Sequence, residues 1–120
     1  MTSMKTIILI PLLSAICIAA STFGQDPVKT SPQYYKVLLE NDRVRVTETS
    51  YKPGADSGMV QRSDRVVRAL TDGTLEKITP DGKKEIIEWK TGQVRYGKKE
   101  TYSQKNIGKT DLVLFVTNLK

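Results

Sequence analysis

The sequence contains no histidine, and its only cysteine, Cys17, lies close to the N-terminus. These absences exclude, over most of the chain, the side chains that most often bind transition metals or act as nucleophiles and general bases. No disulfide can form within the chain after Cys17, so the fold there must be stabilised by packing alone. Aromatic residues are also few, at 7% of the chain, with a single tryptophan.

Long apolar runs are absent except for one near the start of the chain. Lys5 precedes an uncharged run from Ile7 to Ala20, and small and polar residues follow it. This order is typical of a secretory signal peptide, which we predict for residues 1–25; the alternative is an uncleaved anchor. Because the run is short for a membrane span and contains Pro11, we expect a periplasmic or secreted protein with no stable membrane insertion after cleavage.

The formal net charge is +6, but the basic residues are not gathered into one stripe. In EKITPDGKKEIIEWK, for example, lysines alternate with acidic residues. A nucleic-acid-binding protein usually concentrates its basic residues on one face. The dispersed charge therefore predicts that nucleic acid is not a partner.

The remainder of the chain shows the pattern of an all-β protein. In RVRVTET (residues 43–49), valines alternate with polar residues, which is the period of a half-buried strand. Other short β segments are YKVLL, RVVRAL, TLEKIT, KEIIEW, QVRYG and DLVLFVTNL. Such segments, separated by turns, predict a sandwich or barrel over residues 34–120, preceded by a mobile arm at residues 26–33.

Two features give further detail to this prediction. Asp72-Gly73 and Asp81-Gly82 each stand between β segments, which is a hairpin signal because glycine adopts the positive φ that such turns need. The last segment, DLVLFVTNL, is almost continuously apolar. We expect it to be a central strand that is covered on both faces.

The spacing of several glycines resembles a small single-domain cupin, from about Tyr35 to Lys120. The first cupin motif has a glycine, two histidines separated by one residue, a glutamate and a second glycine; at these positions the sequence has Gly54, Val60, Arg62, Val66 and Gly73. The second motif runs from Gly92 to Asn106, with Tyr102 near the position of the last histidine and one residue fewer than the general pattern. The resemblance implies an all-β, cupin-like jelly-roll barrel.

The metal ligands of that family have no counterparts here. Valine has no lone pair to offer and arginine repels a cation, so we predict that the protein has no metal ion and no other cofactor. A calcium site built from Asp56, Asp64 and Glu100 is the alternative, but these residues do not have the spacing of a known calcium loop.

The resemblance implies instead that Val60, Arg62, Val66 and Tyr102 project into the barrel. With Tyr96 they form our predicted ligand-binding set: an arginine and phenols among apolar walls, suited to a small polar or anionic ligand. The alternative is purely structural. In that case Arg62 extends to solvent, Tyr102 is an ordinary core residue, and Met59, Val60 and Tyr96 fill the space.

Three classes of function remain open at this point. We expect a non-catalytic binding module for a small ligand or a protein partner. The alternative is a metal-independent isomerase or lyase that uses Tyr102 and a carboxylate such as Glu100, although no residue fixes the role of general base. An edge strand, YKVLL or RVRVTET, also offers a surface for a homodimer.

Overall fold

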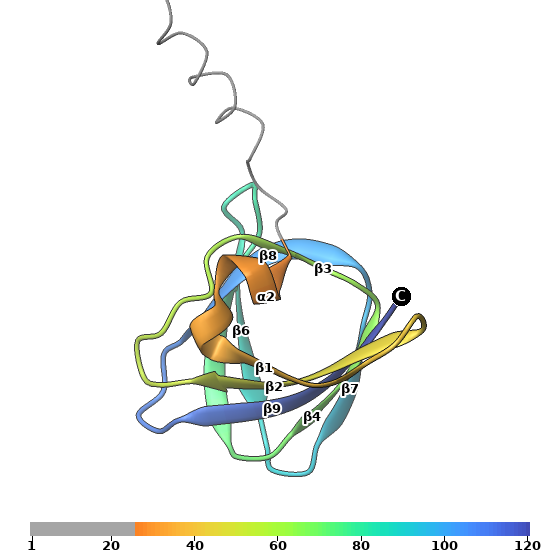
Figure 1. Cartoon of the computed structure of the whole chain (residues 1–120). Helices are drawn as coiled ribbons and strands as arrows, with labels where there is room; N and C mark the ends of the chain where they lie inside the picture. Colours follow the sequence, from red (N-terminus) through yellow and green to blue (C-terminus); the bar gives the residue numbers. More distant parts are fainter. Residues whose placement is uncertain (1–25) are drawn as a thin grey trace, which may run out of the picture.

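The computed structural model describes residues 26–120, which form two antiparallel β-sheets that face each other (Figure 1). The signal peptide predicted for residues 1–25 lies outside the described residues. The first sheet has the strand order β1 (Tyr35–Glu40), β2 (Val44–Tyr51), β9 (Leu112–Leu119), β4 (Arg65–Ala69) and β7 (Val94–Gly97). The second sheet has the order β3 (Val60–Arg62), β8 (Glu100–Asn106), β5 (Gly73–Ile78) and β6 (Lys84–Trp89).

The all-β prediction is confirmed, and each predicted β segment contains a strand. Sequence analysis did not identify β3, which has only three residues, or β8, whose sequence ETYSQKN is mostly polar. The two sheets are not hydrogen-bonded to each other into a closed barrel within residues 26–120. The predicted barrel is therefore a pair of facing sheets.

The apolar core lies between the two sheets, where alternate residues of each strand point inward. Its buried members are Tyr51, Val67, Ala69, Leu75, Trp89, Leu112, Leu114 and Val116. All of them come from residues 26–120, together with both sheets. We therefore expect residues 26–120 to fold on their own.

Two predictions about strand connections differ in outcome. The turn at Asp81-Gly82 joins β5 to β6 as a hairpin, with Gly82 at φ +89°, as predicted. The turn at Asp72-Gly73 instead joins β4 to β5, which lie in different sheets. A turn sequence specifies the local reversal of the chain, but which sheet the next strand joins depends on long-range packing.

One of the two predictions for β9 is confirmed. It is the third of five strands and is therefore central. Its inner face is buried at Leu112, Leu114 and Val116, but Phe115 on the outer face is exposed. The expectation that β9 is covered on both faces is therefore wrong, because no second layer packs outside this sheet within residues 26–120.

The segment predicted as a mobile arm, residues 26–33, packs against the sheets. It contains a short helix, α2 (Pro27–Thr30), and the start of a 3₁₀ turn, η1 (Pro32–Tyr34). The Ser31 hydroxyl donates to the backbone carbonyl of Ser57 at 2.7 Å, and Asp26 accepts two hydrogen bonds from the guanidinium of Arg45. No helix within residues 26–120 is long and apolar enough to cross a membrane.

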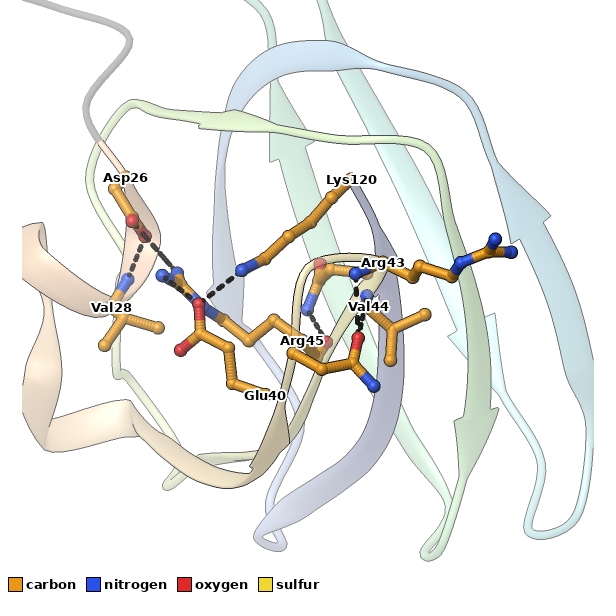
Figure 2. A network of polar contacts seen from close by, with 9 residues as sticks. Asp26, Val28, Glu40, Arg43, Val44, Arg45 and Lys120 are labelled. Carbon is orange, nitrogen blue, oxygen red and sulfur yellow. Dashed lines mark hydrogen bonds and ion pairs between the residues drawn. The ribbon is translucent and has the colours of Figure 1, made fainter.

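The contact between Asp26 and Arg45 belongs to a larger network that also holds the end of the chain (Figure 2). Glu40 lies 3.2 Å from Arg45 and 2.7 Å from Nζ of Lys120. The hydrogen bonds from Lys120 and Arg45 lower the pKa of Glu40. Strands β1, β2 and β9 and the segment before β1 are thus held together at one rim of the sheets.

The glycines that carry the family resemblance have backbone roles. Gly54 and Gly92 both have φ of +86°, a conformation that L-residues with a side chain rarely adopt. Gly73 packs against the core, because a β-carbon there would lie 2.9 Å from Cδ1 of Leu112. These glycines are explained by the fold alone, whatever the chemistry of the site.

Candidate ligand-binding site

Arg62 is a buried arginine on β3. Its neighbours in the strand alternate, so that Val60 and Arg62 point inward and Gln61 points outward. The guanidinium donates to Oγ of Ser57 at 3.0 Å and to the backbone carbonyl of Tyr102 at 3.3 Å, and its Cζ lies 4.3 Å from the centre of the Tyr102 ring. Arg62 is thus held by neutral oxygens and an aromatic face.

A second arginine, Arg65, reaches the same tyrosine from the facing sheet. It lies on β4, and its Nη2 donates to the hydroxyl of Tyr102 at 2.7 Å. Its Nη1 donates to the backbone carbonyls of Ser63 and Lys98, each at 3.0 Å. Since the Tyr102 oxygen accepts from Arg65, its own hydrogen is available to donate to another acceptor.

Lys77 on β5 adds a third positive charge around the same ring. Its Nζ lies 4.6 Å from the ring centre of Tyr102 and 2.7 Å from a carboxylate oxygen of Glu100. Glu100 is therefore the one carboxylate among residues 26–120 that forms an ion pair with this group. We call Arg62, Arg65, Lys77, Glu100 and Tyr102 the Tyr102 cluster.

The charge of this cluster is not balanced within residues 26–120. Arg62 and Arg65 are only 6% and 9% exposed, yet neither forms an ion pair with a carboxylate in this part of the chain. Nε of Arg62 is buried and has no hydrogen-bond partner among these residues. Burying an uncompensated charge is costly, so an anion in contact with these arginines would stabilise the folded protein.

Arg62 remains charged in spite of its burial. Burial opposes the charge of Arg62, but the phenol groups of Tyr102, Tyr35 and Tyr51 outweigh this effect and raise the pKa of its guanidinium. Tyr51 is in turn hydrogen-bonded to the hydroxyl of Tyr35 at 2.7 Å, and burial raises the pKa of Tyr51. The hydroxyl of Tyr51 therefore stays neutral at pH 7 and cannot neutralise Arg62.

The cluster lines a cavity of about 840 Å³ between the two sheets. The segment before β1 and the C-terminal Lys120 contribute to its walls, so the network in Figure 2 lies at its border. Eight basic side chains line it (Arg45, Arg62, Arg65, Lys77, Arg95, Lys98, Lys99 and Lys120), against three acidic ones (Asp26, Asp64 and Glu100). The cavity is therefore strongly positive, which favours an anion.

The structure brings together two of the five predicted site residues, Arg62 and Tyr102. Val60 points inward and is fully buried opposite Tyr102, but it does not line the cavity. Tyr96 borders the cavity, although its side chain is largely exposed. Val66 is on the outer face, so the expectation that it projects into the barrel is wrong.

The error at Val66 has a simple physical reason. Successive residues of a strand point to opposite faces, and Val67 and Ala69 are in the core. Arg65 must then point inward and Val66 outward, one position away from the family's motif. The alternation in RVVRAL is the pattern that places Arg65 inward, so the strand period predicts this residue where the family's motif does not. No comparable pattern predicts Lys77, because the sequence TLEKIT does not show which sheet this strand faces.

The positions of the family's metal ligands do not suit a metal ion. Val60 offers no lone pair, Arg62 is cationic, and Val66 points outward. In the described part of the chain, no three histidine, cysteine, aspartate or glutamate residues come together. A metal cation placed among the positive charges of Arg62, Arg65 and Lys77 would be repelled, so the residues present fit an anion and do not fit a metal.

Comparison with known structures identifies the fold. A cupin domain from Bordetella pertussis Tohama I is 28% identical, with a TM-score of 0.66, over 72% of this chain and 91% of that one. An RmlC-like cupin from Methanocaldococcus jannaschii, described as having a double-stranded β-helix fold, is 17% identical with a TM-score of 0.58, over 71% of this chain and 77% of that one. Together these likenesses show that the chain has the fold of a small cupin domain.

A predicted oxalate decarboxylase from Thermotoga maritima has the same fold, with 22% identity and a TM-score of 0.51 over 71% of this chain and 77% of that one. This likeness concerns the fold alone. No protein-family model matches the chain, and no curated protein matches its sequence.

Gly97 provides a test of the position of Arg65. A β-carbon at Gly97 would lie 2.7 Å from Cζ of Arg65. We expect Gly97→Ala to displace this guanidinium and, for an anion such as phosphate bound in the cavity, to weaken binding at least about tenfold, because a hydrogen bond to a charged group contributes about 1.5–3 kcal/mol. Calorimetric titration measures the affinity. In an Arg65→Met background the same change should have no further effect; an equal loss there would show that Gly97 acts independently of Arg65.

Proposed function

We propose that this cupin domain is a non-catalytic binding module that holds a small anionic ligand, without a metal, in the cavity between its sheets. The observation that carries the proposal is the pair of buried arginines, Arg62 and Arg65, which have no carboxylate partner in residues 26–120. Planar guanidinium groups match carboxylate and phosphate oxygens well. A cavity of about 840 Å³ is of the size used for small ligands.

The charge of the Tyr102 cluster supports a doubly charged ligand. Arg62, Arg65 and Lys77 carry three positive charges, and Glu100 supplies one negative charge. Two positive charges remain, which a dicarboxylate or a phosphate monoester would balance. The free hydrogen of the Tyr102 hydroxyl adds a neutral donor for the same ligand.

A second candidate function uses the same cavity for catalysis. Glu100 and Tyr102 lie two positions apart on β8 and both line the cavity, which is the pair expected in a metal-independent isomerase or lyase. Each is already engaged, however, Glu100 by Lys77 and Tyr102 by Arg65. These contacts support binding over proton transfer. Incubation of a bound anion with the protein, followed by NMR of the anion, distinguishes the two, since only an enzyme changes it.

Export also remains part of the proposal. The charged start and the apolar run from Ile7 to Ala20 support a signal peptide, which would place the cavity in the periplasm or outside the cell. Expression of the full chain, with N-terminal sequencing of the periplasmic fraction, tests this. An intact Met1 in the cytosolic fraction would contradict it.

The direct test of the binding proposal is thermal unfolding of residues 26–120 with a panel of solutes. The panel contains phosphate, sulfate, succinate, acetate, chloride, a neutral hexose and divalent metal salts, all at one ionic strength. A ligand at 100 times its dissociation constant adds about 2.7 kcal/mol, which raises the midpoint by about 10–20 °C for a domain of this size. We expect dianions to stabilise most.

Equal midpoints in succinate and chloride would contradict the proposal, because ionic strength alone would then explain any shift. A larger shift with a divalent metal than with any anion would contradict the assignment of an anion site.

A further inference from the structure

The outer face of the first sheet carries a mostly apolar row that crosses all five strands. The cross-strand register places five residues side by side on this face: Leu39, Val46, Thr117, Val66 and Tyr96. Leu39, Val66 and Tyr96 are 52%, 38% and 57% exposed. No part of residues 26–120 covers this row. Exposed apolar side chains that lie side by side on one face often mark an interaction site.

A neighbouring row on the same face contains both charged and apolar residues. It consists of Lys36, Glu48, Phe115, Arg68 and Val94, again in register across the five strands. Phe115 and Val94 are exposed. We call these two rows together the outer face.

The outer face is self-complementary about its central strand, β9. Glu48 on β2 and Arg68 on β4 flank Phe115 on its two sides. In the other row, Val46 and Val66 flank Thr117 in the same way. A two-fold axis that runs parallel to β9 between two facing copies exchanges the two sides. It therefore sets Glu48 against Arg68 of the second copy, twice, and sets valine against valine.

We propose that the outer face binds the outer face of a second copy of this chain, forming a symmetric dimer. Such a contact has the same patch on both subunits, as in most homodimers, and stacks the sheets with aligned strands. The ligand cavity lies on the other side of the same sheet, and Tyr96 on the edge strand β7 is the one outer-face residue that also borders it. The exposure of Phe115 on a central strand, which the sequence did not predict, is explained by this contact.

The edges of the first sheet are poor alternatives for pairing. RVRVTET forms β2, which is hydrogen-bonded on both sides, so it is not the edge strand considered above. The true edge β1 is irregular between Val37 and Leu39, and the other edge, β7, has four residues. Irregular and short edge strands disfavour pairing through the backbone.

Charge reversal at Glu48 and Arg68 tests the dimer. Sedimentation equilibrium of residues 26–120 should show a dimer for the wild type. Glu48→Arg and Arg68→Glu each place like charges in contact twice, so each should raise the dissociation constant by about tenfold or more. The double variant restores opposite charges and should return the dissociation constant towards the wild-type value.

Glu85→Arg, at an exposed position on β6 in the other sheet, is the matched control and should leave the dimer unchanged. Circular dichroism confirms that every variant is folded. A wild type that is monomeric up to about 1 mM, weaker than a specific interface requires, would overturn the proposal. So would single reversals that dimerise as tightly as the wild type, or a double variant no better than the singles.

Discussion

The Arg62→Met variant of residues 26–120 is expected to be at least as stable as the wild type when no anion is present. Replacing a buried ionic group by an apolar one of similar volume is often neutral or stabilising, by about 1–4 kcal/mol. The substitution leaves few polar groups without a hydrogen-bond partner, because Ser57 Oγ keeps its hydrogen bonds to Gly58 and Gln104. Urea unfolding in an anion-free zwitterionic buffer measures the difference.

In saturating phosphate the order of stability should reverse, so that the wild type is more stable than Arg62→Met. The wild type gains the binding free energy, whereas Arg62→Met loses most of the shift of about 10–20 °C expected at 100 times the dissociation constant. Arg43→Met makes the same substitution at an exposed arginine and should keep the full shift. If Arg62→Met instead loses about 3–5 kcal/mol without anion, the arginine is a structural residue whose bonds stabilise the fold.

Gly73→Ala should destabilise the domain by about 1–3 kcal/mol through overpacking. The added β-carbon would meet Cδ1 and Cβ of Leu112 at 2.9 and 3.0 Å, and Leu112 is fully buried, so it has no free space into which to move. Leu112→Ala alone should cost about 2–5 kcal/mol, because it leaves a cavity in the core. Thermal and urea unfolding measure both.

The double variant tests whether the two effects share one contact. Alanine at position 112 removes Cδ1, so Gly73→Ala should cost less in that background, with a coupling of at least about 0.5 kcal/mol. Additive losses would mean that Gly73 is required for another reason. A loss confined to stability, with phosphate affinity unchanged in the folded variant, would agree with a purely structural role for this motif glycine.

Most of the strands could be predicted from the sequence because their apolar residues alternate or cluster. Strand β8 could not, since its inward residues Tyr102, Gln104 and Asn106 are mostly polar. A polar inward face produces no hydrophobic period, although it is what a ligand cavity requires. The arrangement of strands in two sheets came from the family resemblance, because periodicity contains no information on long-range pairing.

The candidate site was predicted in part for a related reason. Arg62 and Tyr102 occupy positions of the family's motif, and the structure places them in contact. Arg65 was not predicted, because the family's motif position falls on Val66, whereas the alternation of the strand places Arg65 inward. Lys77 comes from a strand distant in sequence, and only the pairing of β5 with β8 brings it to Tyr102. The surplus of positive charge is therefore a property of the fold.

The most direct test of an anion site in the cavity is NMR of the arginine side-chain N–H signals of residues 26–120 during titration with inorganic phosphate. The account predicts that the Nε–H signals of Arg62 and Arg65 shift together and saturate at one dissociation constant, while the signal of the exposed Arg43 changes little. Unchanged signals from Arg62 and Arg65, with gradual and unsaturated changes at Arg43, would contradict an anion site between the sheets.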